Sequence, residues 1–259
     1  MTSTPSPPEP PTRLGSRWRG LLFFLPMAFW TLGMAGLIGV MGMISPSFQR
    51  GGYVAWVRVW GRVPLWLSGV RLEVHGLEHR DAPGPKILIF NHVSLLDLFV
   101  LGSLAPEKAV VLYKKEFARV PGMGMALKSL GMISIDRKNH QAAVRSVARA
   151  SERLREERAT LMMAPEGTRS RRGGLQEFKL GAFHLAATHG IPLVPMIMRG
   201  IETVLPMGSV VIRSGRVSVD YLPPIDTSTW SAESARSHAK DVREQFLEYL
   251  PAEVGTEAE

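Results

Sequence analysis

An uncharged stretch of 24 residues, from Leu21 to Ile44, constrains this chain more than any other feature of its sequence. At 1.5 Å rise per residue, a helix of that length reaches about 36 Å, which exceeds the roughly 30 Å hydrocarbon core of a bilayer. A cleaved signal peptide is the alternative. The apolar region of such a peptide spans only about 7–15 residues and is followed by a small-residue cleavage site, and no such site clearly follows this stretch. The sequence therefore predicts a membrane-inserted helix.

The segments on either side of this stretch differ in character. Residues 1–20 are rich in Pro, Ser and Thr, a composition that predicts a disordered tail. The segment from Tyr53 to Val70 places tryptophans among arginines and contains Pro64. Tryptophan favours the boundary between water and lipid, so we expect an interfacial amphipathic helix, with a core-facing helix as the open alternative. Glycines 33, 36, 39 and 42 would let another helix approach closely.

From Arg71 onward, short apolar runs alternate with helical patterns, which is typical of a sheet covered by helices. We therefore expect an α/β fold with a mixed sheet flanked by helices. The predicted organisation is a tail (1–20), a membrane-associated segment (21–70) and an α/β domain (71–259). Strands are predicted at Leu72–Val74, Ile87–Phe90, Val110–Tyr113, Ile133–Ile135, Thr160–Met163, Leu193–Met198, Val210–Ile212 and Val217–Tyr221. Helices are predicted at Ser94–Leu104, Met123–Leu130, Gln141–Arg158, Lys179–Thr188 and Ala232–Leu250.

Charge and composition exclude several classes of function. Lys and Arg total 31 against 23 for Asp and Glu, so the formal net charge of +8 favours anionic partners. The chain has no cysteine, which excludes disulfides, cysteine-ligated metals and a thiol nucleophile. The basic block at 137–172 lacks interleaved aromatic residues, so we do not expect nucleic-acid binding. The sequence has neither a Gly-x-Ser-x-Gly elbow nor a His-Glu-x-x-His metal motif, and no metal site is predicted.

The most informative local pattern follows the predicted strand Ile87–Phe90, where a helix begins. Ser94 and Asp97 fit a capping box, with Ser94 as the cap and Asp97 in the first helical turn. That arrangement brings Asp97 within reach of His92. A carboxylate beside an imidazole orients the ring and lets its other nitrogen act as a general base. The alternative is a capped helix whose histidine bonds only its own loop.

Two further polar clusters follow predicted strands. The first, at 164–170, offers a carboxylate from Glu166, backbone access at Gly167, a hydroxyl from Thr168 and a guanidinium from Arg169. The second offers the ammonium groups of Lys114 and Lys115. Each alone is compatible with a polar surface loop. If the three preceding strands are parallel, all three clusters meet at one edge of the sheet.

Taken together and in order, these motifs resemble those of the glycerolipid acyltransferase family, and the match spans about residues 90 to 195. The motifs are Asn91-His92-x-Ser94-x-x-Asp97, the stretch from Lys115-Glu116-Phe117 to Ile135-Asp136-Arg137, Pro165-Glu166-Gly167-Thr168-Arg169-Ser170 and Ile191-Pro192-Leu193-Val194-Pro195. The resemblance is closest to members that acylate 1-acyl-glycerol-3-phosphate (lysophosphatidate). It implies that residues 71–259 form an acyltransferase domain.

The resemblance also implies a reaction and a set of roles. An acyl group from acyl-CoA or acyl carrier protein would pass to the sn-2 hydroxyl of lysophosphatidate, giving phosphatidic acid, with His92 as general base and Asp97 as its partner. Substrate would be bound by Lys114, Lys115, Glu166, Gly167, Thr168 and Arg169. No cofactor is implied, and membrane lipids are expected partners.

The resemblance places the site on the cytoplasmic face of a membrane, the inner membrane if the chain is bacterial. Other acceptors remain open: glycerol 3-phosphate, another lysophospholipid or a lyso-aminolipid. Two other functions also remain open: a non-catalytic membrane protein that binds anionic lipids, and a hydrolase.

Overall fold

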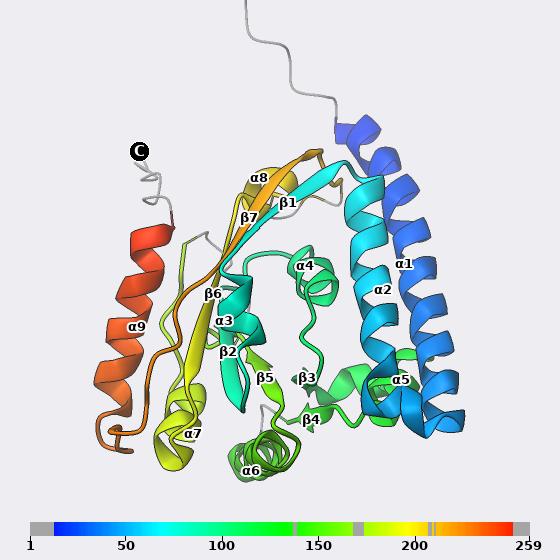
Figure 1. Cartoon of the computed structure of the whole chain (residues 1–259). Coiled ribbons are helices and arrows are strands. Elements are labelled where there is room, and N and C mark those ends of the chain that lie inside the picture. Colours follow the sequence, from blue (N-terminus) through cyan, green and yellow to red (C-terminus); the bar gives the residue numbers. More distant parts are fainter. Residues whose placement is uncertain (1–12, 137–138, 168–173, 207–208, 210, 251–259) are drawn as a thin grey trace, which may run out of the picture.

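The computed structural model describes residues 13–136, 139–167, 174–206, 209 and 211–250, and it is built around one seven-stranded sheet (Figure 1). The spatial order of the strands is β1-β7-β6-β2-β5-β3-β4. Their bounds are β1 Val70–His75, β2 Lys86–Phe90, β3 Ala109–Lys114, β4 Ile133–Ile135, β5 Thr160–Met163, β6 Leu193–Arg199 and β7 Gly215–Tyr221.

The sheet is mixed, as predicted. Strands β6, β2, β5, β3 and β4 are parallel, β7 pairs with β6 in the antiparallel sense, and β1 is parallel to β7. The carboxyl ends of the five parallel strands therefore lie at the same edge as the amino-terminal ends of β7 and β1. All five residues of β2 are buried, as expected for a central strand covered on both faces.

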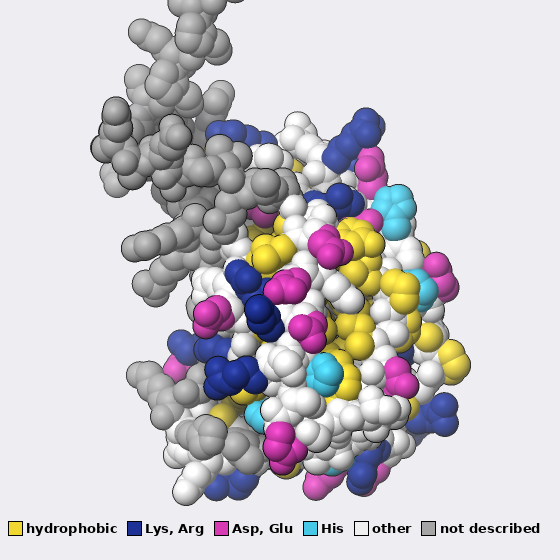
Figure 2. All heavy atoms as spheres, turned by 90° about the vertical axis from the view of Figure 1, so that its left-hand side faces the viewer, with side chains coloured by type: hydrophobic (Ala, Val, Ile, Leu, Met, Phe, Trp, Pro, Cys, Tyr) yellow, Lys and Arg dark blue, Asp and Glu magenta, His cyan; other side chains and the backbone are white. Residues whose placement is uncertain are grey.

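Helices cover the two faces of the sheet. Side chains from α6, α7 and α9 form the core on one face, and α2, α4 and α8 contribute to the core on the other. Figure 2 looks onto the side where α9 and α7 lie, and acidic and basic side chains are both present there around an apolar strip.

The shorter elements are α3 Leu77–Asp81, α4 Asp97–Ser103, α5 Met123–Ser129, α8 Ile201–Val204 and the single turns Phe48–Gly52 and Lys115–Arg119; the longer ones are α6 His140–Glu157, α7 Gly181–His189 and α9 Ala235–Tyr249.

The uncharged stretch lies within helix α1 (Arg13–Ile44), and Leu25–Ile44 is long and apolar enough to cross a membrane. The helix begins at Arg13, so residues 13–20 are helical although composition places them in the predicted tail. Helix α5 approaches α1 at two of the four spaced glycines. A Cβ at Gly42 would lie 2.4 Å from Ser129 Oγ and one at Gly39 would lie 2.8 Å from Met125 Cε, whereas no atom of the described residues lies within 4 Å of a Cβ at Gly33 or Gly36.

Helix α2 (Tyr53–Leu67) contacts both the protein core and the solvent. It runs beside α1, and the indole of Trp30 donates a hydrogen bond to the carbonyl of Trp60 (3.0 Å) (Figure 1). Leu65 is buried, whereas Trp66 is 76 % and Leu67 is 67 % exposed. An exposed apolar surface of this kind is compatible with a lipid boundary. The interfacial position of α2 itself stays a prediction.

Two local predictions were wrong. Val211 and Ile212, the described part of the predicted strand Val210–Ile212, belong to no strand, although Ile212 packs its side chain into the core. A short apolar run indicates burial but does not by itself indicate a pairing partner. The helix predicted from Ser94 begins instead at Asp97, and Ser94 Oγ accepts a hydrogen bond from the Leu96 N–H (3.3 Å) in the preceding turn.

Candidate active site

The loop after β2 is fixed to the neighbouring strand by a buried amide. Asn91 has no exposed surface, its side chain donates to the Met198 carbonyl (2.8 Å), and its oxygen accepts from the Met198 N–H (2.8 Å). These two bonds determine where the chain leaves the sheet and therefore where His92 begins. Sequence reasoning placed Asn91 in a motif but not among the site residues, because nothing local indicates a partner 107 positions away.

His92 and Asp97 form the pair that the spacing predicted. His92 Nδ1 lies 2.6 Å from Asp97 Oδ2, Asp97 is fully buried, and the His92 side chain keeps 23 % of its surface exposed. An ionised carboxylate can only accept, so Nδ1 donates to Asp97 and Nε2 carries the free lone pair. The ring is thus held in one tautomer with its basic nitrogen available to a substrate.

One oxygen of Asp97 also organises the turn between the two residues. Oδ2 accepts from the backbone N–H groups of Val93 (2.8 Å) and Ser94 (3.0 Å) in addition to the imidazole. Half of the predicted capping box is therefore present, since the carboxylate reaches back to the Ser94 N–H. This bonding holds both ends of the five-residue turn, which limits the rotation of the imidazole relative to the sheet.

Glu166 connects the loop after β5 to the same turn. The side chain is buried, Oε1 accepts from the His92 N–H (2.8 Å), and Oε2 accepts from the Gln176 N–H (3.1 Å). Burial raises the pKa of Glu166, and the two backbone N–H groups partly offset that rise. The described hydrogen-bond partners of this carboxylate are therefore backbone donors.

Gly167, the next residue, has a positive φ of 70° that favours glycine. The side chain of Lys179 lies over it, because a Cβ at position 167 would come within 2.7 Å of Lys179 Nζ. The predicted site residues Thr168 and Arg169 lie outside the described residues.

Lys114 ends β3 and Lys115 follows it, and each has a carboxylate near its ammonium group. Lys115 Nζ lies 2.5 Å from Asp136 Oδ2 at the end of β4, and Lys114 Nζ lies 3.7 Å from Glu116 Oε1. Both side chains are about half exposed. Because β2, β5 and β3 are adjacent and parallel, the described residues of the three polar clusters lie at one edge of the sheet.

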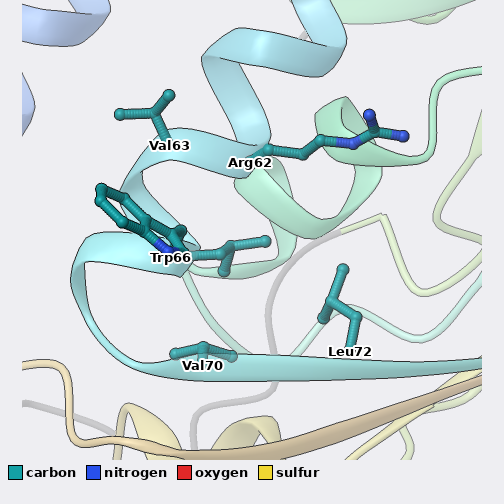
Figure 3. Close-up of a pocket in the computed structure, with 6 residues that line it drawn as sticks. Arg62, Val63, Trp66, Val70 and Leu72 are labelled. Atoms are coloured by element: carbon teal, nitrogen blue, oxygen red, sulfur yellow. The ribbon is translucent and has the colours of Figure 1, made fainter.

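An apolar cavity of about 420 Å³ opens between the end of α2 and the start of β1 (Figure 3). Val70 begins β1 and pairs in register with Gly215 at the start of β7, so the cavity lies toward the same sheet edge as the three clusters. Arg62 extends away from Trp66 in this view. The residues that line the cavity are Arg62, Val63, Leu65, Trp66, Val70 and Leu72.

Three comparisons relate this arrangement to known proteins. A family model described as Acyltransferase matches residues 71–199. A 1-acyl-sn-glycerol-3-phosphate acyltransferase of Limnanthes douglasii is 36% identical over 192 residues, which cover 74% of this chain and 68% of that protein. Its counterpart in Saccharomyces cerevisiae is 32% identical over 236 residues, covering 88% and 78%. In the crystal structure of the 1-acyl-sn-glycerophosphate acyltransferase PlsC from Thermotoga maritima the fold is similar, with a TM-score of 0.75, 21% identity, and 92% and 96% of the two chains covered.

Proposed function

The chain belongs to the 1-acyl-sn-glycerol-3-phosphate acyltransferase family, and we propose that it acylates the sn-2 hydroxyl of lysophosphatidate, forming phosphatidic acid, by His92–Asp97 general-base catalysis. The acyl donor is a thioester, either acyl-CoA or acyl carrier protein. The single observation that carries the proposal is the 2.6 Å contact between His92 Nδ1 and the fully buried Asp97, which leaves Nε2 free for a proton.

The proposed reaction proceeds without an acyl-enzyme. His92 Nε2 takes the proton of the sn-2 hydroxyl as the hydroxyl oxygen forms a bond to the thioester carbonyl carbon. The carbon–sulfur bond then breaks, and the departing thiolate receives the proton from the imidazolium. Asp97 stabilises the imidazolium between these two transfers.

Binding of the acceptor phosphate is assigned to the cationic groups at the sheet edge. Arg169 and Thr168 supply a guanidinium and a hydroxyl, Lys114 and Lys115 supply ammonium groups, and Gly167 lets the backbone approach. Glu166 acts as a positioning residue, because its carboxylate bonds the His92 N–H. The cavity beside α2 would take in an acyl chain from the lipid, in keeping with its apolar lining.

We place this site on the cytoplasmic face of the membrane. Acyl-CoA and acyl carrier protein carry charges that cannot cross a bilayer core unaided, so the donor and the site must share a compartment. Association with a membrane is consistent with the apolar helix Leu25–Ile44 and with the exposed apolar side chains of α2.

The experiment that tests the proposal offers purified protein in lipid micelles a panel of labelled acyl donors and lysolipid acceptors, with products separated by lipid class. We expect phosphatidic acid from lysophosphatidate, and a rate about 10²–10⁴-fold lower for His92→Ala. His184→Ala, at an exposed histidine of α7, is the matched control and should keep full turnover.

Each other result selects a different function. Ordinary turnover by His92→Ala removes the general base from the proposal. Product formation only from another acceptor changes the substrate. Thioester loss without any acceptor indicates a hydrolase, and lipid binding with no transfer indicates a non-catalytic membrane protein.

A further inference from the structure

The side chain of Lys179 is placed unusually for an exposed lysine. It precedes α7 by two positions, and its stem runs along Gly167, since a Cβ at that glycine would lie 2.7 Å from Nζ, 2.9 Å from Cδ and 3.0 Å from Cε. These three distances mean that Cδ, Cε and Nζ all lie close to the loop at Gly167. The ammonium group is thus held above residue 167 and is not directed away from the protein.

The backbone holds Lys179 against this loop. Its N–H donates to the Pro165 carbonyl (2.8 Å), and the preceding segment is anchored where Gln176 N–H donates to Glu166 Oε2 (3.1 Å). Two hydrogen bonds therefore connect residues 176–179 to residues 165–166. The position of Lys179 therefore depends on the conformation of the loop after β5.

The same loop is bonded directly to the catalytic histidine. Glu166 Oε1 accepts from the His92 N–H at 2.8 Å, and Gly167 is the next residue along the chain. Lys179 is thus connected to His92 through one buried carboxylate and one glycine. An anion bound beside Gly167 would lie next to the Lys179 ammonium group, on the loop that bonds the His92 backbone.

Among the described residues, no carboxylate lies within 4.0 Å of Lys179 Nζ. The two lysines at the end of β3 differ in this respect, because Lys115 lies 2.5 Å from Asp136 and Lys114 lies 3.7 Å from Glu116. A cation already paired with a carboxylate must exchange that partner to bind a substrate anion. Lys179 can bind one without that exchange.

We propose that Lys179 binds the phosphate of the lysophosphatidate acceptor from above Gly167. This inference rests on the proposed function and adds a residue to its acceptor site. The ligand chemistry is a phosphate monoester, which the acceptor carries at its head group. The phosphates of CoA are the other source, and they are distinguished below by measuring the donor separately.

The test compares Lys179→Met with the unchanged protein in lipid micelles. Methionine keeps the apolar stem along Gly167 but removes the charge. We expect the KM for lysophosphatidate to rise about tenfold, as for loss of a hydrogen bond to a charged group, with kcat within about twofold and an unchanged KM for the acyl donor. Lys179→Arg restores the positive charge and should therefore restore most of the affinity. If only the packing of the stem mattered, Lys179→Met would already keep that affinity.

Two controls accompany this comparison. Lys240→Met removes an exposed lysine on α9 that pairs with Glu244 (3.8 Å), and it should leave both KM values unchanged. A monoacylglycerol, which lacks the phosphate, should be acylated equally slowly by the unchanged protein and by Lys179→Met.

Three results would overturn the assignment. An unchanged KM for lysophosphatidate in Lys179→Met removes the lysine from the acceptor site while the proposed function stands. A raised KM for acyl-CoA alone would show that Lys179 binds the acyl donor and not the acceptor. If the unchanged protein acylates no lysophosphatidate with either donor, the proposed function fails and the assignment of Lys179 fails with it.

Discussion

Glu166 is a buried carboxylate whose two oxygens each serve a different backbone donor. Oε1 accepts from His92 N–H and Oε2 from Gln176 N–H, so the residue holds the base in place from 74 positions further along the chain. Burial penalises its charged form and raises its pKa above the ordinary value of 4.5. Charging this group in the folded protein therefore costs stability.

That cost predicts a pH dependence. Because the folded state binds the Glu166 proton more tightly than the unfolded state does, the contribution of this group to stability falls as pH rises from about 4.5 through the raised pKa, and is constant above it. Glu166→Gln does not titrate. We therefore expect the Tm of the natural protein, measured relative to that of Glu166→Gln in the same micelles, to decrease over this range.

Other titrating groups are common to both proteins and cancel in the difference. A Tm difference that increases with pH would show that the hydrogen bonds to the carboxylate outweigh its burial. Acyl transfer by the same variant should also be slower, because glutamine has only one acceptor oxygen for two N–H donors.

What could be predicted about individual residues depended on how far apart the partners lie in the chain. His92 and Asp97 are five positions apart, so a turn between a strand and a helix was enough to predict their contact. Asn91 and Met198, or Glu166 and His92, meet only because their strands are neighbours in the sheet. No local pattern indicates such partners, and the position of Lys179 over Gly167 could not be anticipated for the same reason.

The crossing of α2 and α4 requires a residue without a side chain. A Cβ at Gly61 would lie 2.3 Å from Ser103 N and 2.4 Å from Phe99 O, both backbone atoms that cannot rotate away. We expect Gly61→Ala to force the helices apart and to lower the free energy of unfolding by about 1–3 kcal/mol, more than the helix propensity gained. Unfolding by denaturant in micelles measures this change.

Gly33→Ala provides the matched control on α1, since no atom in the described part of the chain lies within 4 Å of its Cβ position. There the substitution should stabilise the helix by about 0.5–1 kcal/mol. Equal effects of the two substitutions would show that α2 and α4 are not packed at Gly61.

Strands and helices were predicted best where the apolar pattern and the flanking residues agreed. Strands β4 and β5 have the predicted bounds, and Asn139 caps α6 by accepting from the Ala142 N–H (3.0 Å). The short helices α3 and α8 were not predicted, because each is about one turn long and has no periodicity to detect. The late start of α4 follows from Asp97 bonding the turn before it.

Helices α1, α2 and α5 and the sheet form one packed body. Met34 and Ile38 of α1, Tyr53 and Val54 of α2, and Ala126 of α5 share a core cluster, and α2 also joins the core beneath the sheet through Leu65. A helix that enters lipid therefore has a fixed orientation relative to His92. This continuity is the reason to expect that the site faces one side of the membrane only.

The absence of cysteine from the natural sequence allows that sidedness to be measured. Glu233→Cys introduces a single thiol at an exposed position ahead of α9. In a bacterium that expresses this variant, we expect a membrane-impermeant maleimide to label the protein only after the cells are permeabilised. Labelling in intact cells would place the acyltransferase domain outside the cytoplasm.

Strand β5 pairs with β2 on one side and β3 on the other, although both of those strands precede it in the chain. During synthesis, β2 and β3 must therefore remain apart until residue 163 has emerged, and such contacts between distant segments form slowly. Helices α1 and α2 leave the ribosome long before that moment. We therefore expect α1 and α2 to meet lipid before the β2-β5-β3 pairing, and with it the site at the sheet edge, can form.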